Sequence, residues 1–168
     1  MIKVTTSTLP FSSGRTINGK IKRYKVTTPK GFSVGKNIGD RLQSKYILFY
    51  ENGKIIKKIE KTLGIFCFKD FNSALYFANQ WVGSELCETR RVNSLIIKEV
   101  IPLSKAIRKP RVIAGKISEI DLFYQSDQKE NKSDEIPEGT VIYDKIKVVG
   151  NLSKVSVDYD RTNFSSRR

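Results

Sequence analysis

The sequence predicts an α+β domain: a mostly antiparallel, twisted sheet with one principal helix, over about residues 71–82, packed on it. Three observations support this prediction. Short runs rich in β-branched and aromatic residues outnumber helical segments along the 168-residue chain. Turn residues separate several of these runs by only a few positions. One segment alone combines helical spacing of apolar residues with both a start and a stop signal.

The first two strands are predicted from residue type. Residues 2–8 contain mostly Ile, Val, Thr and Ser, which favours an extended strand at a sheet edge. Residues 21–28 form the next strand, in which Tyr24 and Val26 share one face. The residues before this strand and the stretch 29–39 are rich in Gly, Pro, Ser and Asn, and we predict loops there.

A hairpin is predicted next. Residues 45–51 have the composition of a strand, and Asn52-Gly53 follows, which is the strongest short hairpin signal. The partner strand is predicted at 54–60. Its apolar residues also repeat with helical spacing, but only ten residues separate Gly53 from Gly64, which favours a strand.

The principal helix follows a short buried strand at 65–68. Asp70 or Asn72 is placed to cap its first amide groups, and Gly83 to end it. The helix carries a spaced apolar stripe: Ala74, Leu75, Ala78 and Trp81.

In the second half of the chain, residues 94–103 and 140–149 have the composition of strands. Residues 111–114 favour another strand, and 117–124 either a short helix or a strand.

The domain organisation follows from a change in composition. Residues 125–139 are polar and acidic, and we expect a mobile loop there. The pattern weakens after Gly150. The prediction is therefore a single α+β domain over residues 1–150 and a C-terminal tail over 151–168.

Charge is distributed unevenly along the chain. Residues 1–118 hold 23 Lys and Arg against 7 Asp and Glu, a net charge of +16, whereas residues 119–168 hold 8 against 10, a net of −2. Such an excess attracts polyanions, so we expect nucleic acid or an acidic protein surface as partner. The residues predicted to make the contact are Arg90, Arg91, Arg108, Lys109 and Arg111. Lysines also crowd 20–25 and 54–61, and an evenly charged, solvated surface stays open as an alternative.

The sequence offers no catalytic residues, cofactor motif or metal site. It contains no histidine, so a Ser or Cys nucleophile lacks its usual base, and no Gly-rich phosphate-binding motif occurs. The two cysteines, Cys67 and Cys87, cannot make a zinc site without further ligands. Cys67 lies in an apolar run and is predicted to be a small buried side chain.

No membrane contact or secretion is expected. The longest apolar runs, such as 46–50, are far shorter than a membrane span, and the N-terminal residues lack the apolar stretch of a signal peptide. We therefore expect the chain in a host cytoplasm or in a virion.

Two resemblances bear on these predictions. The segment Gly64-Ile-Phe-Cys-Phe, followed by Ala74-Leu-Tyr-Phe-Ala78, resembles the strand and helix of ADP-ribosyltransferase-like folds, which implies an NAD-binding enzyme or an inactive relative. No functional residue of those folds is carried over, because the expected His is missing. In its simpler interpretation the segment is core strand and core helix. Together with Arg23-Tyr-Lys-Val and Gly139-Thr-Val-Ile-Tyr-Asp, it also looks like small phage and giant-virus proteins.

The function expected from the sequence is therefore a non-enzymatic, basic binding protein of viral or phage type that contacts nucleic acid or an acidic protein surface without sequence specificity. Two alternatives stay open. The chain would be a minor structural component of a virion or other assembly, in contact with other virion proteins, or an atypical or inactive ADP-ribosyltransferase-like enzyme.

Overall fold

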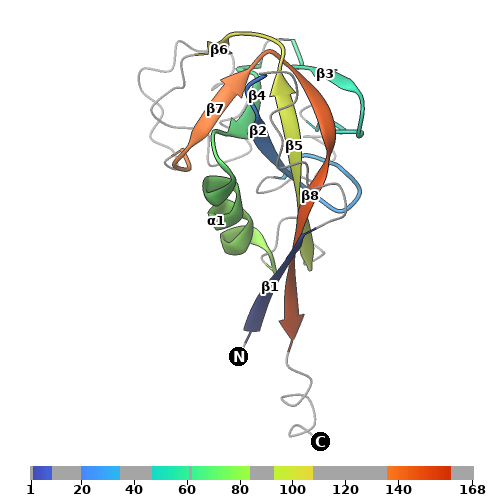
Figure 1. The fold of residues 1–168 in the computed structure, drawn as a ribbon, viewed down its shortest axis with the longest axis vertical. Coiled ribbons are helices and arrows are strands. Elements are labelled where there is room, and N and C mark those ends of the chain that lie inside the picture. Colours follow the sequence, from blue (N-terminus) through green and yellow to red (C-terminus); the bar gives the residue numbers. More distant parts are fainter. Residues whose placement is uncertain are drawn as a thin grey trace, which may run out of the picture.

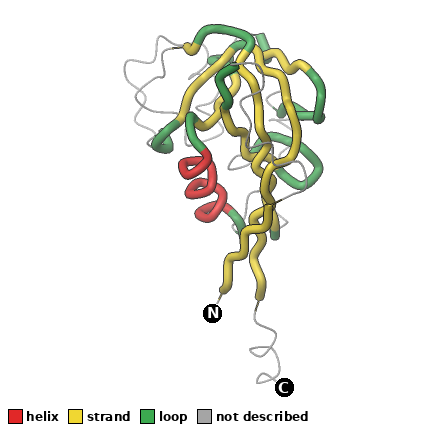
Figure 2. Tube along the Cα trace, viewed as in Figure 1, coloured by secondary structure: helices red, strands yellow, loops and turns green. Residues whose placement is uncertain are grey.

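A computed structural model describes residues 2–8, 20–34, 47–60, 62–83, 93–107 and 136–159. For residues 2–8, 158 and 159 it describes the backbone alone. These residues form an eight-stranded antiparallel sheet and one α-helix that lies on one side of it (Figure 1). The predicted fold class is confirmed. Figure 2 shows the sheet curling around its long axis, with the helix at its flank.

The sheet is built around its longest strand, β8 (Lys145–Tyr159). The strand order is β1-β8-β5-β2-β4-β7-β6, and β3 pairs with β8 as well. The bounds of the other strands are β1 Ile2–Thr8, β2 Arg23–Thr27, β3 Ile55–Lys57, β4 Ile65–Phe68, β5 Ser94–Pro102, β6 Ala106–Ile107 and β7 Thr140–Tyr143. As predicted for residues 2–8, β1 lies at an edge of the described sheet, where β8 is its one partner among the described strands.

Strand β8 corrects the predicted domain organisation. Residues 151–159 were expected in a C-terminal tail, but they form the second half of β8 and pair with both β1 and β5. The register against β5 slips at Val149 and Leu152, where β8 carries an extra residue. Such bulges interrupt the alternation of side chains, which hides the strand from a pattern with period two. The predicted strand 140–149 is likewise two strands, separated at Asp144.

The predicted hairpin is also wrong, although its turn is present. The amide of Lys54 donates to the carbonyl of Glu51 at 3.2 Å, which closes a turn at Asn52-Gly53. Residues 47–50, however, pair with 31–33 through an isolated bridge, and β3 pairs with β8. The short-range turn signal cannot reveal that the chain after it binds a partner some ninety residues away.

The helix α1 (Phe71–Trp81) confirms its predicted start and end. A carboxylate oxygen of Asp70 accepts from the Ser73 amide at 2.8 Å, and the Val82 amide donates to the Ala78 carbonyl at 2.9 Å. Gly83 follows with a φ of 77°. Ala74 and Ala78 have no exposed surface and pack on the sheet.

The last four residues of the mobile acidic loop predicted at 125–139 form a defined turn. Residues 136–139 form a tight turn, in which the Thr140 amide donates to the Pro137 carbonyl at 3.2 Å. The Gly139 carbonyl then accepts from the Lys69 amide at 2.7 Å, so this turn is held against the start of α1. The segments predicted at 111–114 and 117–124, and residues 125–135 of the loop, lie outside the described residues.

The core has two parts because alternate residues of β4 and β5 point to opposite faces of the sheet. The first part lies under α1: Val26, Phe68, Ala74, Ala78, Val82, Leu95, Ile97, Val155 and Val157. The second lies on the other face, beneath residues 47–50: Tyr50, Ile65, Cys67, Val100, Tyr143, Ile146 and Val148. The segment Gly64–Ala78 is thus core strand and core helix, as its simpler interpretation predicted.

Candidate functional site

All five residues predicted to contact a polyanion lie outside the described residues: Arg90, Arg91, Arg108, Lys109 and Arg111. The structure therefore leaves that prediction untested. The candidate site must be built from the cations of the described residues, and their placement divides them into two groups. One group lies on the exterior and the other lies in the interior of the sheet.

The exterior group gathers where β7 ends and β8 begins. Lys57 pairs directly with Lys145 across β3 and β8, and Lys147 lies two residues farther along β8. The Leu103 amide donates to the Lys145 carbonyl at 2.9 Å, which brings the segment carrying Lys105 to the same place. We call this group the corner lysines: Lys54, Lys57, Lys58, Lys105, Lys145 and Lys147.

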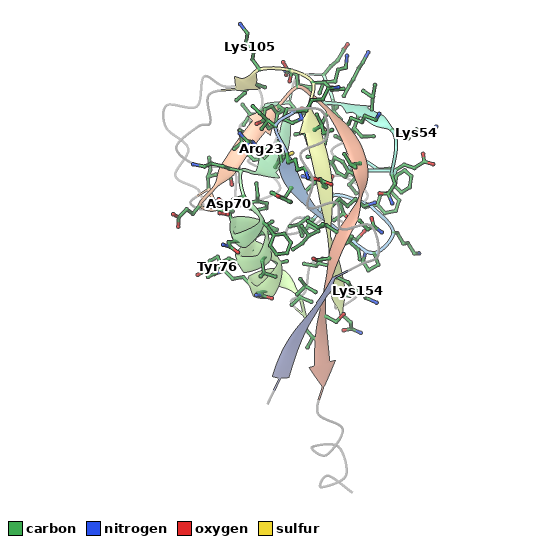
Figure 3. The ribbon with its side chains drawn as sticks, viewed as in Figure 1. Arg23, Lys54, Asp70, Tyr76, Lys105 and Lys154 are labelled. Atoms are coloured by element: carbon green, nitrogen blue, oxygen red, sulfur yellow. The ribbon has the colours of Figure 1, made fainter. Side chains whose placement is uncertain are left out.

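The topology explains why residues from three distant parts of the sequence meet here. The amides of Asp144 and Lys145 both donate to the Ser104 hydroxyl, at 3.0 and 3.2 Å. The Lys58 amide donates to the Asp144 carbonyl at 2.8 Å. The chain reversal at Asp144 therefore ties residues 57–58 and 103–105 to one corner. Figure 3 shows Lys105 at the top of the molecule, Lys54 at the right beside β3, and Lys154 farther down β8.

The corner lysines are poorly neutralised. In residues 51–60, 102–107 and 143–148, which form the corner, the carboxylates are Glu51, Glu60 and Asp144. Lys58 forms an ion pair with Asp144 at 2.8 Å. The other corner lysines form no ion pair with any described residue, and all of them except Lys58 and Lys145 are exposed. Like charges directly opposite each other in a sheet are destabilising, so the pair Lys57 and Lys145 has a cost that a bound anion would relieve.

The cations at residues 20–25, which the sequence places in one basic cluster, are mostly turned inward. Only Lys20 is exposed. Lys22 forms an ion pair with buried Glu99 at 2.9 Å. The Arg23 guanidinium donates to the Tyr143 hydroxyl at 2.9 Å, from Nε. These cations therefore stabilise the fold and add little to the outer surface.

Lys25 and Lys98 are the most deeply buried cations of the described residues. They lie directly opposite each other on β2 and β5, with 8% and 6% of their surface exposed. The Lys25 ammonium donates to the Phe66 carbonyl at 2.6 Å and lies 4.9 Å from the centre of the Tyr50 ring. The Lys98 ammonium donates to Asn52 Oδ1 at 2.8 Å, and its burial lowers its pKa. The sequence alone gave no sign of this pair, because each lysine looks like an ordinary charged residue within a predicted strand.

Cys67 is fully buried and belongs to the second part of the core. Burial raises the pKa of its thiol to about 11, although the positive charges of Lys25 and Arg23 act in the opposite direction. The thiolate is therefore scarce at neutral pH, and the residue is a packing group as predicted. Tyr50 is also core, with 2% of its surface exposed.

Within the described ranges, no three Asp, Glu or Cys side chains gather closely enough to hold a metal ion. Among the described residues, no helix has the length and apolar character that crossing a membrane requires.

No protein-family model, curated protein or solved structure matches the chain. The resemblances to phage and giant-virus proteins and to ADP-ribosyltransferase-like folds therefore stay predictions.

Proposed function

We propose that the protein is a non-enzymatic binding protein that holds nucleic acid through the corner lysines and reads the phosphate backbone without base specificity. The observation that carries the proposal is the direct opposition of Lys57 and Lys145, flanked by Lys147 and Lys105. Lysine ammonium groups bind phosphate as point charges and carry no information about sequence.

Nucleic acid is favoured over an acidic protein surface because the lysines extend along a corner of the sheet. Phosphates follow one another along a nucleic acid backbone at a regular spacing, which suits an extended row of cations. Carboxylates on a folded protein would need a matching geometry. Competition by polyglutamate tests this second partner in the same assay.

The test measures fluorescence anisotropy of a labelled duplex of mixed sequence at several salt concentrations. With about five phosphates neutralised, affinity should fall roughly 500-fold between about 50 and 200 mM salt. The variant K57Q/K105Q/K145Q should bind at least tenfold more weakly at low salt, and its salt slope should be smaller by about three.

The matched control is K20Q/K69Q/K154Q, which removes three exposed lysines outside the corner. Both variants change the net charge equally, so a non-specific attraction would weaken both alike. Equal losses in the two variants, or no binding of the unmodified protein at low salt, would contradict the proposal. Displacement by polyglutamate at the same charge concentration would favour an acidic protein partner instead.

A further inference from the structure

Two exposed phenylalanines form a pair beside the sheet. Phe32 and Phe49 retain 40% and 47% of their surface exposed. Their ring centres are 5.3 Å apart, with 48° between the ring planes, and their backbones form an isolated bridge. Exposing large apolar side chains of this kind to water is unfavourable, so a pair of them on the exterior suggests a ligand.

Hydrogen bonds from neighbouring residues hold the pair in place. The Tyr50 amide donates to the Gly31 carbonyl at 2.8 Å, and the Ser33 amide donates to the Leu48 carbonyl at 3.1 Å. Tyr50 is buried and Leu48 half-buried, so Phe49 between them must point outward. The Phe32 amide donates to the Thr28 hydroxyl at 3.1 Å. Because these backbones are fixed before any ligand arrives, binding costs little conformational entropy.

The surroundings of the pair are cationic. Among the described residues 28–34 and 47–54, the charged side chains are Lys30 and Lys54 against Glu51, and all three are exposed. The backbone of Lys54 also connects this region to the corner lysines. Its carbonyl accepts from the Val148 amide at 2.9 Å, next to Lys147. Residues 47–50, which carry Phe49, thus lead through Lys54 into β3, the strand that carries Lys57.

We propose that Phe32 and Phe49 stack on unpaired bases of a single-stranded nucleic acid whose phosphates contact Lys30 and the corner lysines, Lys54 among them. This inference rests on the proposed function and specifies its ligand. Aromatic rings stack on any base, which gives affinity without sequence preference, whereas the bases of a duplex are already stacked on one another. A single strand should therefore bind more tightly than the duplex, because the duplex uses the lysines alone.

The test compares two labelled probes, a mixed-sequence single strand of about 20 nucleotides and the duplex of the same sequence. The variant F32A/F49A should bind the single strand roughly tenfold or more weakly, and the duplex within about twofold of the unmodified protein. F32L/F49L should behave in the same way, because it keeps apolar volume and removes the rings. Tyr76→Ala is the matched control, since Tyr76 is an aromatic side chain on α1 with 66% of its surface exposed.

The outcomes separate this inference from the proposed function. If the phenylalanine variants lose no affinity for the single strand, or lose as much for the duplex, the stacking inference is wrong, whatever the corner variant shows. If K57Q/K105Q/K145Q binds both probes normally while F32L/F49L loses the single strand, the corner lysines are not the phosphate site and stacking stands. A second copy of the chain as the occupant would appear as a dimer in size-exclusion chromatography that F32L/F49L abolishes, and this result would also overturn the inference.

Discussion

Single residues in the interior of the sheet carry charge where an apolar side chain would be expected. Lys25 and Lys98 oppose each other across β2 and β5, and no described carboxylate forms an ion pair with either one. Glu99, next to Lys98 in the chain, points to the other face, where Lys22 binds it. Lys98 instead binds Asn52 and so anchors the turn at residues 51–54 to the sheet. Lys98 thereby positions residues 51–54, although burying its charge lowers the stability of the fold.

That cost predicts a dependence of stability on pH. The pKa of Lys98 is lower in the folded protein than its usual value of 10.5. Between these two values the unfolded chain binds more protons than the folded one, so this residue makes stability rise with pH. At pH values below the pKa of Lys98 in the folded protein, the destabilising effect of burying this charge is present in full. Lys98→Met should therefore be more stable than the unmodified protein at pH 7, and the gain should shrink as pH rises toward 10.5.

Urea unfolding of both proteins across this pH range measures the difference. Lys105→Met is the control, because Lys105 is exposed and has no such burial. A difference for Lys98→Met that stays constant with pH, or a loss of stability at pH 7, would show that the bond to Asn52 outweighs the cost of burial.

Among the elements, α1 shows how a local signal and a distant contact combine. Its capping residue Asp70 accepts from both the amide and the hydroxyl of Ser73, at 2.8 and 3.1 Å. The turn at residues 136–139 packs against the same first turn of the helix. The cap lies within four residues of sequence, but the covering turn comes from a segment more than sixty residues later. The start of α1 is thus fixed locally and then covered by tertiary structure.

Gly139 allows this close approach. Its φ is +78°, and a Cβ atom there would lie 2.3 Å from Ser73 Oγ and 2.6 Å from Ser73 Cβ. We expect Gly139→Ala to lower the free energy of unfolding by about 2–4 kcal/mol, from backbone strain together with the steric clash. Gly53→Ala is the matched control, with a φ of +82° and no atom within 4 Å of the added Cβ.

Gly53→Ala should lower the free energy of unfolding by about 1 kcal/mol, from backbone strain alone. Denaturant unfolding of the two variants gives both values. Equal losses at the two positions would mean that the turn at residues 136–139 does not press on the helix in solution.

For the molecule as a whole, β8 connects parts of the sheet that no other described strand joins. It pairs with β5 along most of its length, with β1 at one end and with β3 at the other. Val155 and Val157 in its second half belong to the core under α1. The corner lysines also depend on it, because β8 supplies Lys145 and Lys147 and aligns β3 beside them.

A chain that ends at residue 150 should therefore not fold cooperatively. It would lose every pairing partner of β1 and about half of the residue pairs between β5 and β8, together with two buried valines. We expect no cooperative thermal transition in circular dichroism. A chain that ends at residue 159 keeps all of β8 and should retain the transition. Cooperative unfolding of the shorter chain would show that residues 151–159 are the tail that their composition suggests.

Much of the fold was predictable because its causes are local. The helix was predicted from a cap, an apolar stripe and a terminating glycine within fourteen residues. Strands β2, β4 and β5 were predicted from runs of β-branched and aromatic residues. The excess of basic residues was also evident from the sequence, but its arrangement was not. The aromatic pair Phe32 and Phe49 gave no signal, because exposed and buried phenylalanines look alike in a sequence.

The amino-acid sequence by itself determined the fold class, the helix with both its ends and the large excess of basic residues. Only the tertiary structure decided that β3 pairs with β8, that β8 continues to Tyr159, and which lysines point outward. The physical reason is the distance along the chain over which each interaction acts. Capping, turn closure and side-chain periodicity act within a few residues, whereas strand pairing and the burial of a charge depend on segments brought together from distant parts of the chain.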